Sequence, residues 1–163
     1  QYMEFVSVQN DWQEAIPRIS RYHLVNFDIP WKFKIEEWIN KVLPDRKMPK
    51  QLVVVGRSQW FTNTLDAVRY IVDYLEKKPR LVRFFKFTWG VDEIIFQTIL
   101  YNSDLKTTMV NENLRYIDWS EGKSSPKTLT MVDKEALENC GKFFARKFNV
   151  EVDKEILNYL DSR

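Results

Sequence analysis

Cysteine and histidine are nearly absent from this sequence of 163 residues, which has one of each, Cys140 and His23. A single cysteine excludes an internal disulfide and is typical of a reducing compartment. One cysteine and one histidine, far apart in the chain, do not make a metal-ligand cluster, so we expect no metal and interpret His23 as a structural or surface residue. No stretch resembles the nucleophile elbow that would accompany a Ser/His/Asp triad.

Long apolar runs, glycine-rich motifs and an excess of one charge are also missing. No apolar run approaches the roughly 18–20 residues of a membrane span, and no signal-peptide pattern follows Gln1. The absence of GxGxxG and of a P-loop leaves no nucleotide cradle that a motif would reveal. Lys and Arg total 25 against 23 Asp and Glu, a net charge of +2 that is too balanced for a non-specific nucleic-acid binder. We therefore expect no nucleic-acid partner and no transmembrane segment in this piece.

The chain is instead rich in apolar and aromatic residues. Hydrophobic residues make up 44% of the sequence, which is enough for the core of one domain or a large part of one. Aromatic residues make up 15%, including six Trp and eleven Phe. Core packing is the default interpretation of such a surplus, and a groove or partner surface is the alternative.

Apolar periodicity predicts short strands mixed with helices. Strands are predicted at 5–8, 23–27, 52–55 and 111–119, with Gly56 breaking the third and a second short strand or strand edge at 58–61. Helices are predicted near Pro17, at 34–43, at 65–77 after a cap at Thr62 or Thr64, from Thr130 or Asp133 to about Asn139, and from Asp153. The segment 81–87 fits either a helix or a strand.

The stretch 87–100, FTWGVDEIIFQTIL, carries the first candidate for chemistry. Its apolar residues are too dense for a surface helix, so we expect a helix buried on most sides. Asp92 is predicted to cap that helix and Glu93 to lie in its first turn, beside Trp89. Glu93 is therefore a candidate general base. The alternative is that both carboxylates only cap the helix and offset its dipole.

Two lysines are the remaining candidates. Lys127 follows a Ser-Ser-Pro loop, and Lys147 lies in the aromatic-basic segment 143–148. One carboxylate, Glu93, and two cations in separate loops fit a base combined with a diphosphate clamp. The alternative for either lysine is a solvated surface position.

Four stretches resemble one family as a set. They are GRSQWF at 56–61, DEIIFQT at 92–98, PKTL at 126–129, and FARKF at 144–148 followed by Val152 and Asp153. In this order they resemble the C-terminal half of the core-2/I-branching β-1,6-N-acetylglucosaminyltransferases, whose relatives include the peptide O-xylosyltransferases. The resemblance spans roughly residues 56–163.

The resemblance implies an α/β fold, the C-terminal part of a GT-A-like glycosyltransferase with a small mixed sheet and flanking helices. It implies that residues 1–163 are the C-terminal portion of one catalytic domain, whose N-terminal nucleotide-binding half is missing and would be its partner. The implied chemistry is metal-independent inverting transfer of a sugar, expected to be N-acetylglucosamine, from a UDP-sugar to a glycan hydroxyl, with no cofactor. Glu93 would be the base, and Lys127 and Lys147 would bind the diphosphate. Many members have Arg at Lys127 and Pro at Val91.

The acceptor is expected to contact Trp60, Trp89, Arg18 and Arg21. We expect this piece alone to be inactive, and we interpret the enzyme as cytoplasmic and bacterial, at most peripheral to a membrane, making a surface polysaccharide. Two alternatives are non-catalytic. One is a carbohydrate-binding module that stacks sugars on Trp60, Trp89 and Trp119, and the other is a protein-interaction domain with a basic-aromatic face.

Overall fold

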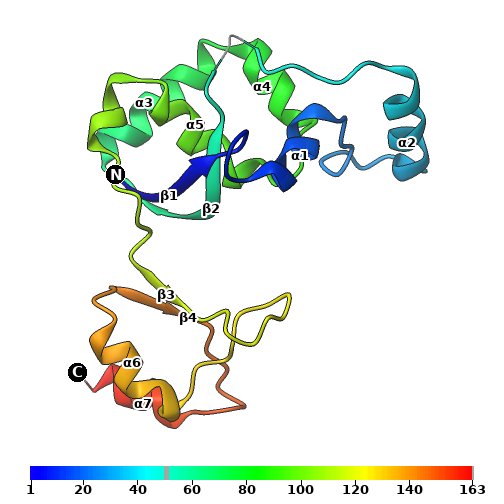
Figure 1. Cartoon of the computed structure of the whole chain (residues 1–163). Coiled ribbons are helices and arrows are strands. Elements are labelled where there is room, and N and C mark those ends of the chain that lie inside the picture. The colour runs from blue at the N-terminus through cyan, green and yellow to red at the C-terminus, as the bar shows by residue number, and fades with distance from the viewer. Residues whose placement is uncertain (50–51, 163) are drawn as a thin grey trace. The chain divides into compact units, whose positions relative to one another are not determined.

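The computed structural model describes residues 1–49 and 52–162, which form two compact units, Gln1–Asn113 and Leu114–Arg163. Each unit combines one two-stranded sheet with short helices (Figure 1). The mixed α/β content agrees with the predicted class, but the predicted small mixed sheet is wrong, because one described sheet is antiparallel and the other parallel. The GT-A assignment stays a prediction. The prediction that all 163 residues belong to one catalytic domain stays a prediction.

The sheet of the first unit pairs β1 (Tyr2–Ser7) with β2 (Val55–Thr62) in antiparallel register, from Met3 opposite Phe61 to Ser7 opposite Val55. The strand predicted near 5–8 is thus confirmed. The break predicted at Gly56, between strands at 52–55 and 58–61, is wrong, because β2 runs through this glycine. Gly56 serves close packing against a neighbouring turn.

Helices and 3₁₀ turns supply the rest of the first unit. They are η1 (Gln13–Ala15), α1 (Ile16–Ser20), α2 (Lys32–Val42), α3 (Leu65–Glu76), α4 (Pro79–Lys86), η2 (Val91–Glu93), α5 (Ile95–Tyr101) and η3 (Asp104–Thr108). The predicted cap of α3 is confirmed, since the Thr64 hydroxyl accepts from the Ala67 amide at 3.3 Å. The strand predicted at 23–27 is wrong. There the His23 amide donates to the Phe87 carbonyl, and the Leu24 amide donates to Glu36, so neither joins a ladder.

Two apolar clusters form the core of the first unit, and the stretch from Ile94 through α5 contributes to both. Ile94 packs in one cluster with Trp12 and Phe85, whereas Ile99 and Leu100 pack in the other. From residue 97 to residue 100 every side chain is at most 1% exposed. The predicted burial of this helix is therefore confirmed.

Helix α2 (Figure 1) is held to its unit by polar contacts. The Asn40 side chain bonds the amide and the carbonyl of Tyr22, both at 2.8 Å, and Glu36 accepts from Leu24 at 2.8 Å. Its aromatic residues face outward, with Trp38 64% exposed. Within the described ranges, no helix has the length and apolar character to cross a membrane.

The second unit is built on a parallel pair, β3 (Arg115–Ile117) and β4 (Phe144–Arg146). The other elements are η4 (Met131–Asp133), α6 (Lys134–Asn139) and α7 (Glu155–Asp161). Thr130 and Asp133 form a reciprocal capping box, so the predicted helix start there is confirmed. Leu129 and Ile156 are fully buried in this unit.

Candidate functional site

Glu93 lies in a 3₁₀ turn, and the expected cap geometry is wrong. Helix α5 begins at Ile95, its N-cap is Ile94, and no side chain caps it. The chain instead reverses at Gly90, which has φ +60, and the Glu93 amide donates to the Gly90 carbonyl at 3.2 Å. The turn separates Asp92 and Glu93 from the helix. Their expected role as helix-capping carboxylates is therefore not what positions them.

Gly56 brings β2 against the backbone of Glu93. A Cβ at Gly56 would lie 2.2 Å from the Glu93 carbonyl oxygen and 2.9 Å from Cα of Ile94. Real Cβ atoms do not approach backbone so closely, so only glycine fits at this strand position. The glycine of the GRSQWF stretch thus determines how closely the Glu93 backbone packs against β2.

Two polar residues of α5 complete the connection to β2. The Gln97 amide nitrogen donates to the Ser58 carbonyl at 2.6 Å, and the Thr98 hydroxyl bonds both the carbonyl of Val55, at 2.9 Å, and its amide, at 3.2 Å. Both side chains are fully buried. Sequence reasoning assigned no structural task to Gln97 or Thr98, although both belong to the DEIIFQT stretch that carried the resemblance.

The carboxylate of Glu93 pairs with Arg18. Arg18 Nη1 lies 2.5 Å from Glu93 Oε2, and the two side chains are 18% and 31% exposed. The Arg18 guanidinium also lies 4.8 Å from the ring centre of Trp12 and 4.6 Å from that of Trp89. Trp12 is buried and was missed by sequence reasoning, because a Trp packed in a core gives no motif.

Of the four predicted acceptor residues, Arg18 and Trp89 lie at Glu93. Arg21 is the exposed C-cap residue of α1, and its carbonyl accepts from Arg46 at 2.8 Å. Trp60 lies in β2 and is 38% exposed. The acceptor roles of all four residues stay a prediction.

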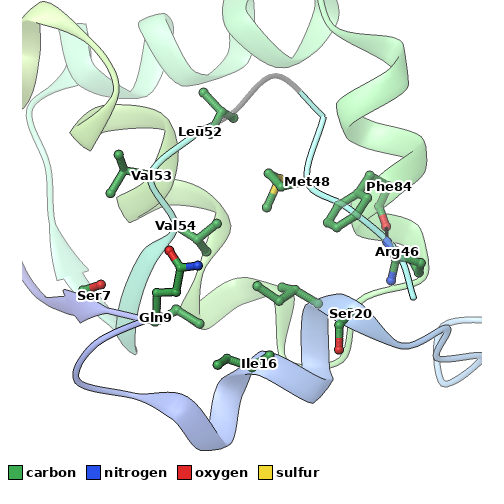
Figure 2. Close-up of a pocket in the computed structure, with 12 residues that line it drawn as sticks. Ser7, Gln9, Ile16, Ser20, Arg46, Met48, Leu52, Val53, Val54 and Phe84 are labelled. Atoms are coloured by element: carbon green, nitrogen blue, oxygen red, sulfur yellow. Dashed lines mark hydrogen bonds between the residues drawn. The ribbon is translucent and has the colours of Figure 1, made fainter. Parts of the chain in front are cut away.

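An apolar pocket of about 470 Å³ lies elsewhere in the first unit (Figure 2). Its lining includes Val54, Met48 and Phe84, and the guanidinium of Arg46 closes one end. Arg46 donates to the carbonyls of Phe84 and Phe87, and burial lowers its pKa to about 10. Glu93 does not line this pocket, so the candidate active site remains at Glu93.

Lys127, in the second unit, is bound to carboxylates. Its Nζ lies 2.5 Å from Asp133 Oδ1 and 3.9 Å from Asp118 Oδ2. The hydrogen bond to Asp133 raises the pKa of Lys127. Burial alone would raise the pKa of Asp133, but its bonds to Lys127 and Thr130 prevail and lower it. Asp133 was predicted only as a cap, yet it also sets the direction of the Lys127 side chain.

Backbone hydrogen bonds place Lys147 beside Lys127. The Lys147 amide donates to the Lys127 carbonyl at 3.5 Å, and the Leu129 amide donates to the Lys147 carbonyl at 2.7 Å. The Lys147 residue is exposed. The two predicted clamp residues, 20 positions apart, are thus neighbours in one unit. Glu93 belongs to the other unit, so its grouping with them stays a prediction.

Carboxylates, histidine and cysteine do not gather into a metal-ligand group anywhere in residues 1–49 and 52–162.

Comparison with known proteins identifies relatives of this chain. The family model described as "Branch: Core-2/I-Branching enzyme" matches residues 11–141. Xylosyltransferase 2 of Rattus norvegicus is 32% identical over an alignment of 137 residues that covers 73% of this chain and 16% of that protein. Xylosyltransferase 1 of Mus musculus is 32% identical over an alignment of 139 residues that covers 74% of this chain and 14% of that protein. The chain thus spans about a sixth of the length of the curated relatives it matches.

Proposed function

Because the chain belongs to the core-2/I-branching enzyme family, we propose that it carries the catalytic base and the diphosphate clamp of an inverting glycosyltransferase. The donor would be a UDP-sugar and the acceptor a glycan hydroxyl. The observation that carries the proposal is the partly exposed Glu93 carboxylate, held by Arg18 at 2.5 Å within the residues that match the family model. A carboxylate that is fixed in direction yet open to solvent suits proton abstraction.

The proposed reaction is a single displacement. Glu93 takes the proton of the acceptor hydroxyl as that oxygen bonds the anomeric carbon of the donor sugar. The bond from this carbon to the diphosphate oxygen breaks on the opposite face, and UDP departs with the electron pair. Configuration at the anomeric carbon is inverted, since the attack and the departure take place on opposite faces of the sugar.

Lys127 and Lys147 would offset the charge that develops on the departing UDP, in place of a metal ion. Their adjacency through backbone bonds supports a joint role. A lysine binds phosphate as a point charge without the paired contacts of arginine, so Lys147 and Lys127 would act together.

The donor sugar follows from the relatives only as a proposal. The resemblance suggests N-acetylglucosamine, and the relatives named above are xylosyltransferases, so UDP-xylose and UDP-N-acetylglucosamine are the first donors to test. Trp89 is 51% exposed beside Glu93 and offers a stacking platform to an acceptor sugar. These relatives are animal proteins, and the bacterial, cytoplasmic source stays a prediction.

We further propose that this chain alone is inactive, because the resemblance implies that uridine is held by an N-terminal half that precedes these residues. Titration calorimetry of the isolated chain with UDP should show little or no heat. Sub-millimolar binding would contradict this part of the proposal.

Replacement of Glu93 tests the proposed base. In the complete enzyme, Glu93→Gln should bind the donor normally and lose roughly 10²–10⁴ in turnover, because a general base is removed. Asp92→Asn removes the adjacent exposed carboxylate and should keep full turnover. Retention of more than about half the activity by Glu93→Gln would refute the role.

A non-catalytic carbohydrate-binding module is the second candidate, favoured by exposed tryptophans such as Trp119, which is 54% exposed. Such a module would bind a glycan without consuming donor. Glycan binding by the complete protein, with no transfer from any UDP-sugar supplied, would favour this candidate over the enzyme.

A further inference from the structure

We propose that Arg18 is the positioning residue of Glu93 and that Trp12 and Trp89 hold its guanidinium in place for that task. The inference rests on the proposed role of Glu93 as the general base. Under this proposal Arg18 affects catalysis by orienting the Glu93 carboxylate. It does not bind the acceptor directly.

The ion pair determines which carboxylate oxygen is engaged. Arg18 Nη1 binds Oε2 of Glu93 at 2.5 Å, in a charge-assisted hydrogen bond that links residues 75 positions apart. The bond restricts rotation of the carboxylate about its last side-chain torsion. Because Oε2 is committed to Arg18, Oε1 is the oxygen assigned to receive the proton of the acceptor hydroxyl.

The two tryptophans form a slot for the guanidinium. Its carbon lies 4.8 Å from the ring centre of Trp12 and 4.6 Å from that of Trp89, both inside the range of a cation–π contact. Trp12 is 4% exposed, and its indole N–H donates to Glu14 at 2.8 Å, so this wall is fixed. Trp89 is 51% exposed and forms the outer wall. The planar shape of arginine suits such a slot, and the point charge of lysine does not.

Two local features concern how the fold accommodates the Arg18 side chain. One is a cost in stability, and the other is the space that a glycine provides. Its Nε is buried and has no hydrogen-bond partner, an arrangement that stability alone disfavours. Gly90, with φ +60, leaves room for it, because a Cβ there would lie 3.1 Å from Nη1 of Arg18 and 3.8 Å from Oε2 of Glu93. Function at the Glu93 carboxylate gives a reason for keeping a buried donor unpaired.

Because the slot encloses the Arg18 side chain, we infer that Arg18 positions Glu93 and does not bind the acceptor. The Arg18 side chain is only 18% exposed, and its charge is directed at Glu93. Substitution of a residue that binds the acceptor would raise the acceptor KM. A positioning residue affects kcat instead, because misplacing a reacting group by about 1 Å costs roughly 10²-fold in rate.

The first experiment separates these outcomes by steady-state kinetics of the complete enzyme. Arg18→Gln should lower kcat about 10²-fold and leave the acceptor KM within about twofold. Arg18→Lys keeps the charge and should recover part of the loss, which also covers the case in which the Gln variant does not fold. The matched control is Arg57→Gln, which removes another arginine near Trp12, at 5.7 Å, and should leave kcat unchanged. A raised acceptor KM with unchanged kcat in Arg18→Gln or Arg18→Lys would overturn the inference.

A double-mutant cycle tests whether Arg18 acts through Glu93. In the Glu93→Gln background, adding Arg18→Gln should change the residual kcat by less than about threefold, since the carboxylate to be positioned is gone. An equal loss in both backgrounds would overturn the inference while leaving Glu93 as the base. Full activity of Glu93→Gln itself would instead contradict the proposed function.

Discussion

Alanine at position 56 would test whether β2 sets the position of Glu93. The added Cβ would lie 2.2 Å from the Glu93 carbonyl oxygen and 2.9 Å from Cα of Ile94, whereas carbon atoms in good contact are about 3.5 Å or more apart. Both neighbours are backbone atoms, so no flexible side chain can move aside. Strand β2 and turn η2 must therefore separate by about 1 Å, because each Cβ distance falls short of about 3.5 Å by roughly that much.

The expected effects are on stability and on turnover. Overpacking of this kind costs typically about 1–3 kcal/mol, and each kcal/mol lowers the midpoint of thermal unfolding by about 2–4 °C in a chain of this size. The same shift displaces Glu93, so kcat of the complete enzyme should fall by up to about 10²-fold. Circular dichroism gives the midpoint, and initial rates at saturating donor and acceptor give kcat.

Gly122→Ala is the control for loss of a glycine without a clash. Gly122 has φ +62, and a Cβ there would meet no atom within 4 Å, so only the left-handed backbone is strained, at about 1–2 kcal/mol. That variant should be somewhat less stable with unchanged kcat. Wild-type stability in Gly56→Ala would refute the packing argument. Lowered stability with wild-type kcat would refute the link from β2 to Glu93.

Three further predictions address other contacts. Thr98→Val should lower the free energy of unfolding by about 1–3 kcal/mol in denaturant titrations, because valine removes the bonds to Val55. Thr98→Ser keeps those bonds and should cost less, about 0.8 kcal/mol for its lost buried methyl group. Removing Lys127 or Lys147 should weaken UDP binding about ten- to a hundredfold in the complete enzyme, with activity unaffected by EDTA; strict dependence on added manganese would contradict this. The pKa of Asp133 is lowered below 3.8, so its ionised form stabilises the fold above that pH and the benefit is lost as pH falls through the folded-state pKa. The stability deficit of Asp133→Asn at pH 7 should therefore shrink in acid, and a deficit independent of pH would refute the reasoning.

Helices and their caps were the most predictable part of the fold. Periodic apolar residues indicated α2 and α3, and Thr64, Thr130 and Asp133 act on amides within three or four positions of themselves. Such interactions depend on near neighbours in the chain, so the sequence alone determines them to a large extent.

The strands and the start of α5 depended on distant partners. The apolar segment 23–27 had strand character but does not pair with a strand among the described residues, and β2 continues through Gly56 because this residue pairs with Val6 of β1. Strand pairing is decided by long-range contacts, which local propensity does not contain. Gly90 likewise produced a 3₁₀ turn where a helical first turn was expected.

In the candidate site too, some features follow from the sequence and others only from the tertiary structure. The sequence predicted Glu93 beside Trp89 at the start of a buried apolar run, and its motifs indicated the family that the comparisons then showed. Only the tertiary structure placed Arg18 on Glu93 between Trp12 and Trp89, and Lys127 on Asp133 beside Lys147. The physical reason is that an ion pair across 75 positions depends on how helix, strand and turn pack together, and no periodicity or spacing in the chain encodes that distance.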